Sequence, residues 1–194
     1  MGSFSPRIVD KTNNAPPGGR KGNDDMRKQK GFSLIELLIV VAIILIIAAI
    51  AIPNLLKSRI AANEASTTST LRTLNTAEIT FASTYNSGFT DTLNRLCAPL
   101  SGQPDMNNSD LVDPVLCGRQ SANTVGFVKA GYLFTYTPTF TAPGNASWGY
   151  IAQYLVVADP QARGSSGQRS FLTNESAVIR ANATAAATLS DNPL

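Results

Sequence analysis

The chain has 194 residues, of which 43% are hydrophobic and 15% are charged, and this length suits one modest domain with appendages. The formal net charge of +3 is uneven, because residues 1–31 contain seven basic and three acidic residues whereas the remainder contains nine basic and ten acidic residues. The remainder therefore lacks the basic stripe of a nucleic-acid-binding domain. The sequence has no histidine, which removes the commonest general base and the commonest metal ligand.

Residues 1–25 are rich in proline, glycine, asparagine and charge and have no apolar period, so we expect them to be disordered. Met26 opens a compact basic stretch that would form a six-residue leader ending at Gly31. Our hypothesis is that translation starts at Met26 and that residues 1–25 are not made. The mass of an uncleaved precursor would decide this, and any peptide from residues 1–25 would contradict it.

Residues 32–52 form a nearly continuous apolar run of 21 residues. As a helix this run would be about 31 Å long, which matches the hydrocarbon core of a bilayer. Because Arg27, Lys28 and Lys30 precede the run, we expect a cytoplasmic N-terminus and translocation of everything after Pro53. The alternative is a secretory signal peptide that is removed whole. The length of the run and the lack of an A-x-A-like cleavage site oppose that alternative.

Pro53 lacks a backbone donor and is expected to kink or end the helix at the close of the apolar run. Residues 54–86 still have a helical composition, and Gly88 is expected to stop the helix. The apolar residues of this second half fall on one side, which predicts an amphipathic helix. The predicted stripe consists of Ile60, Leu71, Leu74, Phe81 and Tyr85, and the charged residues Glu64, Arg72 and Glu78 decorate it.

Residues 87–124 are irregular in composition, and strand-like runs follow them. The runs are residues 125–137, 148–158, 170–172 and 177–180. They predict three or four antiparallel strands with one face on the helix stripe, a hairpin turn at residues 163–167, and a frayed tail from Ala181. The predicted fold class is therefore α+β, with a long N-terminal helix whose first half is transmembrane, packed on a small antiparallel sheet.

Glu36 is the anomaly of the apolar run. A carboxylate inside a transmembrane helix costs a few kcal/mol on insertion scales, about 2.5–3.5 kcal/mol at the helix centre for Asp, Lys or Arg. One interpretation is a chance polar residue near the helix end that extends to the lipid headgroups. The other interpretation is a function that offsets this cost, and Glu36 taken alone leaves both open.

The run Lys30-Gly31-Phe32-x-x-x-Glu36, followed by the apolar residues and Pro53, resembles the N-terminus of type IV prepilins and the related pseudopilins. The resemblance covers residues 27–60 closely. It implies that a membrane aspartic protease, the prepilin peptidase, cuts between Gly31 and Phe32 and then methylates the new amine of Phe32. It also implies that Glu36 is the family's conserved glutamate and that Pro53 is the kink proline of its long helix.

The resemblance further implies how such a subunit assembles. In a core of packed apolar helices the free amine of Phe32 would be a buried cation, and Glu36 of a neighbouring subunit would pair with it. The pair would set the register between subunits, while the apolar helices supply most of the cohesion. The implied domains are a leader at residues 1–31, a membrane and filament-core helix at 32–53, its amphipathic half at 54–86, and an extracytoplasmic loop and sheet domain at 87–194.

The function implied by the resemblance is that of a structural subunit of a type IV pilus, used for adhesion, motility or DNA uptake. The alternatives are a pseudopilin of a type II secretion system and, more remotely, a membrane-anchored binding module. Two cysteines and the lack of a clear acidic cluster at the C-terminus favour a pilin. A catalytic role is not expected, since no nucleophile with a base and no paired carboxylates are recognisable.

The implied partners are further copies of the chain, with or without minor pilins, the prepilin peptidase, an inner-membrane assembly platform, and membrane lipid before assembly. No cofactor, metal or nucleic-acid partner is predicted. The precursor is expected in the bacterial inner membrane as a single-pass protein with a cytoplasmic N-terminus, and the mature protein in a pilus at the cell surface.

Cys97 and Cys117 both lie on the translocated side, and 19 residues separate them. In an oxidising compartment they are expected to form a disulfide with a structural role, worth about 3 kcal/mol by chain-entropy estimates. Two free thiols or a metal pair are the alternatives, and the absence of histidine and of further cysteines disfavours a metal site.

A structural role is also expected for two other sets of residues, the aspartates of the irregular segment and the aromatic residues of the strand-like runs. Asp105, Asp110 and Asp113 could bind a hard cation such as Ca²⁺, but their spacing matches no calcium loop, so a solvated acidic loop is preferred. The aromatic residues of the strand-like runs are expected to pack in the sheet or on its surface rather than form a binding platform. They are Tyr132, Trp148, Tyr150 and Tyr154.

Overall fold

A computed structural model of the chain describes residues 31–118, 126–142 and 149–194. The predictions for residues 1–30, including the leader and the start at Met26, and the prediction for Trp148 lie outside these ranges. The chain divides into two compact units, Met1–Ile43 and Ile44–Leu194. The first is described from Gly31 onward, and the second contains the sheet and most of the helix.

Helix α1 spans Leu34–Tyr85, a single element of 52 residues with Pro53 inside it. The predicted long helix is confirmed, and it continues through Pro53 instead of ending there. Proline removes one backbone hydrogen bond, and the turns on either side keep theirs. The helix ends before Gly88, at Tyr85, where Asn86 adopts a left-handed φ of 49° and its amide donates to Ala82 O at 3.0 Å.

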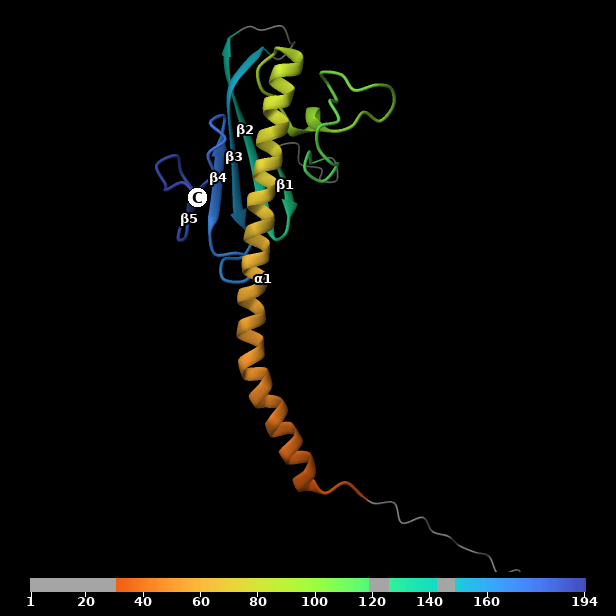
Figure 1. Cartoon of the computed structure of the whole chain (residues 1–194), viewed down its shortest axis with the longest axis vertical. Coiled ribbons are helices and arrows are strands. Elements are labelled where there is room, and N and C mark those ends of the chain that lie inside the picture. Colours follow the sequence, from red (N-terminus) through yellow and green to blue (C-terminus); the bar gives the residue numbers. More distant parts are fainter. Residues whose placement is uncertain (1–30, 119–125, 143–148) are drawn as a thin grey trace, which may run out of the picture. The chain divides into compact units, whose positions relative to one another are not determined.

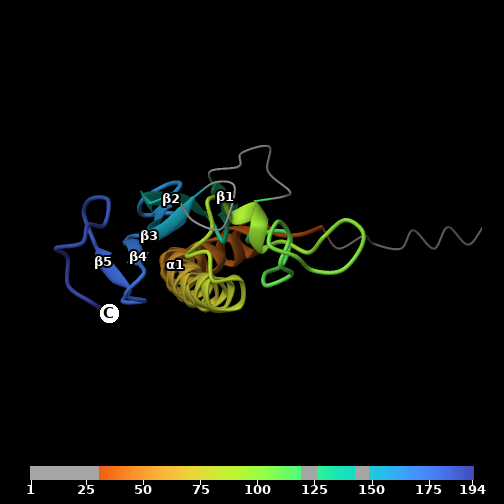
Figure 2. The same cartoon turned by 90° about the horizontal axis from the view of Figure 1, so that it is seen from above.

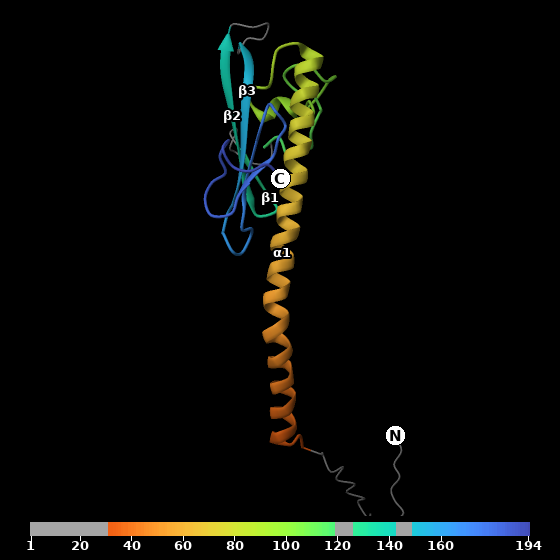
Figure 3. The ribbon, with the colours of Figure 1, turned by 60° about the vertical axis from the view of Figure 1, so that its left-hand side comes forward.

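Five antiparallel strands form one sheet in the order β1-β2-β3-β4-β5, so that sequential strands are neighbours. Figures 1 and 3 show the strands running along α1, and Figure 2 shows the sheet on one side of this helix. The α+β fold class is therefore confirmed, with more strands than the three or four predicted. The strands are β1 (Gly126–Lys129), β2 (Tyr132–Ala142), β3 (Tyr150–Pro160), β4 (Ser170–Asn174) and β5 (Arg180–Asn182).

The run at 125–137, predicted as one strand, is in fact a hairpin of β1 and β2. Lys129 pairs with Tyr132, which leaves Ala130 and Gly131 as a two-residue loop. Both loop residues have positive φ angles, 49° and 74°, as a primed hairpin turn requires. The prediction failed because an alanine at the first loop position lacks the Asn-Gly or Asp-Gly signal of such turns.

The C-terminal tail is ordered, and the prediction that it frays from Ala181 is wrong. Strand β5 lies at residues 180–182 instead of 177–180, and the last residues of the chain pair with its outer edge. The Ala181 amide donates to Asn192 O at 3.3 Å, and the Leu194 amide donates to Ile179 O at 2.9 Å. The tail thus covers the edge of the sheet, which satisfies backbone groups that would otherwise face water.

The core lies between the sheet and the second half of α1. The predicted helix stripe is confirmed at Leu71, Leu74 and Phe81, which have no exposed surface, and Ile60 and Tyr85 are half-buried. The sheet contributes large aromatic and aliphatic side chains to the same cluster: Phe127, Tyr132, Phe134, Tyr136, Tyr154, Val156 and Phe171. Helix and sheet therefore share one continuous apolar core.

Glu64 holds α1 against the connection between β3 and β4. Its carboxylate accepts hydrogen bonds from the amides of Gln168 and Arg169, both at 3.0 Å, and from Arg169 Nε at 2.8 Å. Burial alone would raise the pKa of Glu64, but these hydrogen bonds and the charge of Arg169 lower it below its ordinary value. The sequence analysis placed this residue beside the stripe without recognising that it is buried and bonded.

The disulfide predicted between Cys97 and Cys117 is present, with a Cα–Cα distance of 5.6 Å. Both cysteines are buried in the core beside the short 3-10 helix η1, Leu93–Leu96. The closed loop is also tied back by its backbone, since the Leu111 amide donates to Leu96 O at 2.8 Å. Covalent, apolar and hydrogen-bonded contacts thus fix the irregular segment to the core.

Replacement of both Cys97 and Cys117 by alanine is expected to lower the free energy of unfolding by roughly 3 kcal/mol, because the unfolded chain regains the entropy of the open loop. Denaturant unfolding of the full chain in detergent, followed by circular dichroism, measures the change. Reduced wild-type protein is the control that separates the cross-link from the packing of the side chains. A double variant as stable as the oxidised wild type would contradict the prediction.

Glu64→Ala is expected to destabilise the domain by about 2 kcal/mol, since it leaves two amides of the β3–β4 connection without their acceptor. Arg169→Ala keeps both amide bonds and removes a half-exposed ion pair, so its expected loss is under about 1 kcal/mol. The folded pKa of Glu64 is lowered from 4.5, so its contribution is complete above pH 4.5 and is lost as the pH falls through the folded value. Equal losses in the two variants at neutral pH would show that the ion pair, and not the amide bonds, carries the effect.

Candidate functional site

The N-terminal segment places Glu36 in the first turn of α1. The Ser33 amide donates to Glu36 Oε2 at 2.9 Å, and the Leu37 amide donates to Ser33 O at 3.2 Å. Ser33 is therefore the N-cap, and Glu36 reaches back from the third helical position as in one half of a capping box. Phe32, which precedes the cap, is 78% exposed.

The cap gives Glu36 a function within the single chain that the sequence analysis missed. The Ser33-x-x-Glu36 spacing before an apolar run is itself a helix-start signature, so the signal was available in the sequence. A carboxylate near the positive end of the helix dipole is also stabilised by that dipole. One amide uses only part of the acceptor capacity of a carboxylate, so Glu36 can receive further donors while it caps the helix.

The backbone conformation of Gly31 does not require a glycine. A Cβ atom built at this residue meets no heavy atom within 4 Å, and its φ is not in the left-handed range. A side chain at this position would therefore fit the fold.

The apolar residues in the first half of α1, from Leu34 to Leu56, are exposed over the whole circumference of the helix. In the first unit the exposed fractions of Leu34 and Ile35 are 80% and 63%, and in the second unit those of Ile50 and Leu55 are 65% and 71%. Among the described residues, α1 is the helix that is long and apolar enough to cross a membrane. Such a surface is stable only against lipid or against other apolar helices.

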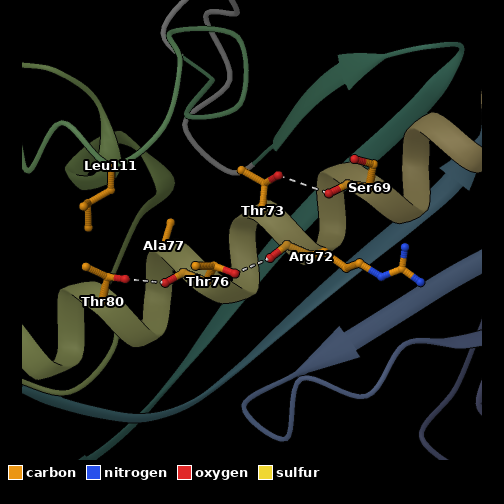
Figure 4. A pocket seen from close by; sticks show the side chains of 7 residues that line it. All are labelled: Ser69, Arg72, Thr73, Thr76, Ala77, Thr80 and Leu111. Atoms are coloured by element: carbon orange, nitrogen blue, oxygen red, sulfur yellow. Dashed lines mark hydrogen bonds between the residues drawn. The ribbon is translucent and has the colours of Figure 1, made fainter.

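A shallow groove lies on the face of α1 that turns away from the sheet, beside Leu111 of the disulfide loop. Figure 4 shows its threonine hydroxyl groups pointing along the helix toward the preceding turn. Thr73, Thr76 and Thr80 donate to the carbonyl oxygens four residues earlier, at 3.1, 3.0 and 2.7 Å. These hydroxyl groups are occupied within the helix and present their methyl groups outward, so the groove has no set of groups arranged for catalysis.

The acidic residues of the disulfide loop hold its turns. Asp105 Oδ1 accepts from the amides of Asn107 and Asn108, and Asp113 Oδ1 accepts from the amides of Val115 and Leu116, all between 2.8 and 3.0 Å. Across the described ranges no three acidic or sulfur-containing residues are grouped as a metal site would need. Asp105 and Asp113 thus stabilise turns of the loop through their side chains.

The aromatic residues of the sheet are mostly structural. Tyr132 and Tyr154 are buried, and their hydroxyl groups donate to Arg169 O at 2.8 Å and to Asn75 Oδ1 at 3.0 Å. Tyr150 is 41% exposed on the first residue of β3. The expectation of packing rather than a stacking platform is confirmed for the two buried residues.

Comparison with known proteins gives one family model at the N-terminal segment and two relatives that match over short stretches. Residues 26–52 match the family model of the prokaryotic N-terminal methylation motif. The type IV wide pilus major component PilA4 of Thermus thermophilus is 67% identical over 39 residues, which are 20% of this chain and 30% of that protein. The type IV major pilin protein PilA of Myxococcus xanthus is 48% identical over 56 residues, which are 29% of this chain and 26% of that protein.

The alignments thus cover less than a third of the length of either relative. No solved structure matches the chain significantly. The methylation motif includes the capped start of the apolar helix. The chain thus carries a prepilin-type N-terminal segment and is similar there to type IV pilins.

Proposed function

We propose that the chain is a structural subunit of a type IV pilus. The precursor would sit in the bacterial inner membrane with a cytoplasmic N-terminus, and the prepilin peptidase would cut it between Gly31 and Phe32 and methylate Phe32. Copies of the mature chain would then polymerise through α1 at an inner-membrane assembly platform, with or without minor pilins. The observation that carries this proposal is Glu36, a carboxylate in the first turn of α1, because the rest of the first half of this helix is apolar and exposed.

Electrostatics gives Glu36 a partner in a filament. Cleavage before Phe32 creates a cationic amine, and burial of this amine among apolar helices strands an unpaired charge. The capping geometry holds the Glu36 carboxylate at the helix start while leaving it acceptor capacity for a neighbour's amine. We therefore propose that Glu36 of one subunit pairs with Phe32 of the next.

Residues 32–53, which include the first half of α1, would serve as both membrane anchor and filament core. Lipid and packed helices are equally apolar to its side chains, so the subunit can leave the bilayer without exposing them to water. Pro53 would allow the helix to adjust locally where the membrane-facing part meets the amphipathic part. We call the sheet and the second half of α1 the head domain. Its buried carboxylates, Glu64 and Glu78, accept hydrogen bonds inside the fold, which supports a structural rather than catalytic function.

A pilus is favoured over a secretion pseudopilus by the comparisons, because both relatives are pilus proteins. The Cys97–Cys117 disulfide fits either filament, since both the periplasm and the cell exterior are oxidising. Adhesion, surface motility and DNA uptake are the activities that we propose for such a filament.

Two substitutions of Glu36 separate helix capping from charge pairing. Gln at this position can still accept the Ser33 amide, whereas Leu cannot. Because an uncompensated buried amine costs roughly 3–5 kcal/mol, we expect both Glu36→Gln and Glu36→Leu to reduce filament yield by about 100-fold or more. The measurement is the amount of subunit in sheared filaments, with total subunit and helix content as controls. Normal filaments from Glu36→Gln would show that the cap, and not the charge, is needed.

Gly31→Leu tests processing independently of the fold. The structure leaves room for a side chain at residue 31, so the variant should insert and fold like the wild type. We expect the protease to reject it, so that the subunit accumulates as uncleaved precursor and no filaments form. The intact mass and the N-terminal residue of the purified protein report cleavage, and the wild-type chain should begin with methylated Phe32. A wild-type chain that begins elsewhere would refute the proposed cleavage site.

A further inference from the structure

Glu78 is a fully buried carboxyl group in the second half of α1, with no exposed surface. The Thr90 amide donates to its Oε2 at 3.0 Å, and Thr90 Oγ1 donates to its Oε1 at 2.7 Å. Both oxygens of the carboxyl group are thus engaged by one residue of the turn that follows the helix. The helix pattern predicts Glu78 only as a charged residue beside the apolar stripe.

The surroundings of Glu78 disfavour a negative charge. Tyr136 from β2 and Tyr154 from β3 face it with neutral phenol groups, and the nearby Asp91, which is paired with Arg95, adds repulsion. Burial raises the pKa of Glu78 to about 7, although the hydrogen bonds from Thr90 and Tyr136 lower it. Glu64, on the same helix, has a cationic partner and a lowered pKa.

The same geometry satisfies both protonation states. With Glu78 ionised, the Thr90 hydroxyl donates to it at 2.7 Å. With Glu78 protonated, its hydroxyl can donate to Thr90 Oγ1, which then turns to donate to Tyr136 Oη at 3.2 Å. Tyr136 Oη in turn donates to Thr90 O at 2.7 Å. The neutral state therefore has a complete hydrogen-bond chain and avoids burying a charge.

The turn that Glu78 holds, residues 87–90, lies on the edge of the sheet. Gly88 forms a parallel bridge with Ile151, and the Phe89 amide donates to Ile151 O at 2.8 Å. Strand β4 pairs with β3 from Leu155 onward, so the turn occupies the place beside Ile151. A Cβ at Gly88 would collide with the Ile151 backbone, which shows how closely the turn is seated.

One buried hydroxyl group in this turn lacks a hydrogen bond. The hydroxyl of Ser87 is buried and has no hydrogen-bond partner among the described residues. An unsatisfied buried hydroxyl favours any state in which water can reach it. The Glu78–Thr90 hydrogen bonds and the Phe89–Ile151 hydrogen bond therefore keep the turn closed. They oppose Ser87, whose hydroxyl group would gain hydrogen bonds to water if the turn opened.

We propose that Glu78 is a proton-dependent latch: its protonated carboxyl group keeps residues 87–90 seated on β3, and loss of the proton favours opening of this turn. Opening hydrates the carboxylate and the Ser87 hydroxyl, and it uncovers the backbone of Ile151 as a free sheet edge. The latch lies in the head domain and does not depend on the proposed filament function.

The direction of the pH effect follows from proton linkage. In the closed turn the pKa of Glu78 is about 7, and in an opened, hydrated turn it returns toward its ordinary value of 4.5. Opening therefore releases a proton between these two values, and the opening equilibrium rises about tenfold per pH unit in that window. Above about pH 7 both states are ionised and the equilibrium levels off.

Amide hydrogen exchange of the full chain in detergent tests the latch. After correction for intrinsic exchange, the protection of the Phe89 and Thr90 amides should fall about tenfold per pH unit up to about pH 7 and then level off. In Glu78→Gln, which keeps a carbonyl acceptor but cannot titrate, the protection of these amides should not depend on pH. Asp191→Asn removes a carboxylate of the C-terminal tail, which is bonded to Thr188 and Asn182, and should behave like the wild type.

Three results would overturn the proposal. The first is a pH slope that persists in Glu78→Gln. The second is equal pH dependence at the Val157 and Leu172 amides of the central strands, which would mean global unfolding instead of local opening. The third needs no variant: the infrared band of a protonated carboxyl group in wild-type protein at about pH 6 should be present, and its absence would show that Glu78 titrates like an ordinary glutamate.

Discussion

The exposed apolar surface of α1 is the constraint on which the rest of the structure depends. From Leu34 to Leu56 the side chains of this helix have large exposed fractions on all sides, and a single chain offers them no cover. The free energy of that surface in water, about 25 cal/mol per Å², has to be removed by lipid or by other helices. The head domain must therefore fold on a helix whose other half is committed to a different environment.

The second half of α1 meets this constraint by changing its pattern from apolar all round to one-sided. Leu71, Leu74 and Phe81 enter the core, while the opposite face carries threonines whose hydroxyl groups are bonded within the helix. Glu64 then fixes the helix to the β3–β4 connection, and the disulfide holds the loop that returns from the helix to the sheet. Each contact ties the sheet to the helix that would anchor it.

The sequence was sufficient for features set by local pattern. Periodicity predicted the long helix and its buried stripe, and the shared compartment of the two cysteines predicted the Cys97–Cys117 disulfide. Features that depend on contacts between distant segments were missed. The Ala130–Gly131 turn lacks the usual residues, and the ordered tail depends on pairing of residues 192–194 with the region of β5. Burial of Glu64 and Glu78 was also missed, because charge in a helix pattern normally indicates a solvated face.

Three glutamates on α1 differ in the partners of their carboxylates, and for Glu64 and Glu78 these partners decide which protonation state is favoured. Glu64 has two amides and a guanidinium group, so the anion is favoured despite burial. Glu78 has Thr90 and neutral phenol groups and is near Asp91, so the neutral acid is favoured. Glu36 accepts from one amide and lies at the start of an exposed apolar segment, so its carboxylate can take further donors. In the proposed filament water is excluded, and under the proposed cleavage each added subunit would bring such a donor, the amine of Phe32.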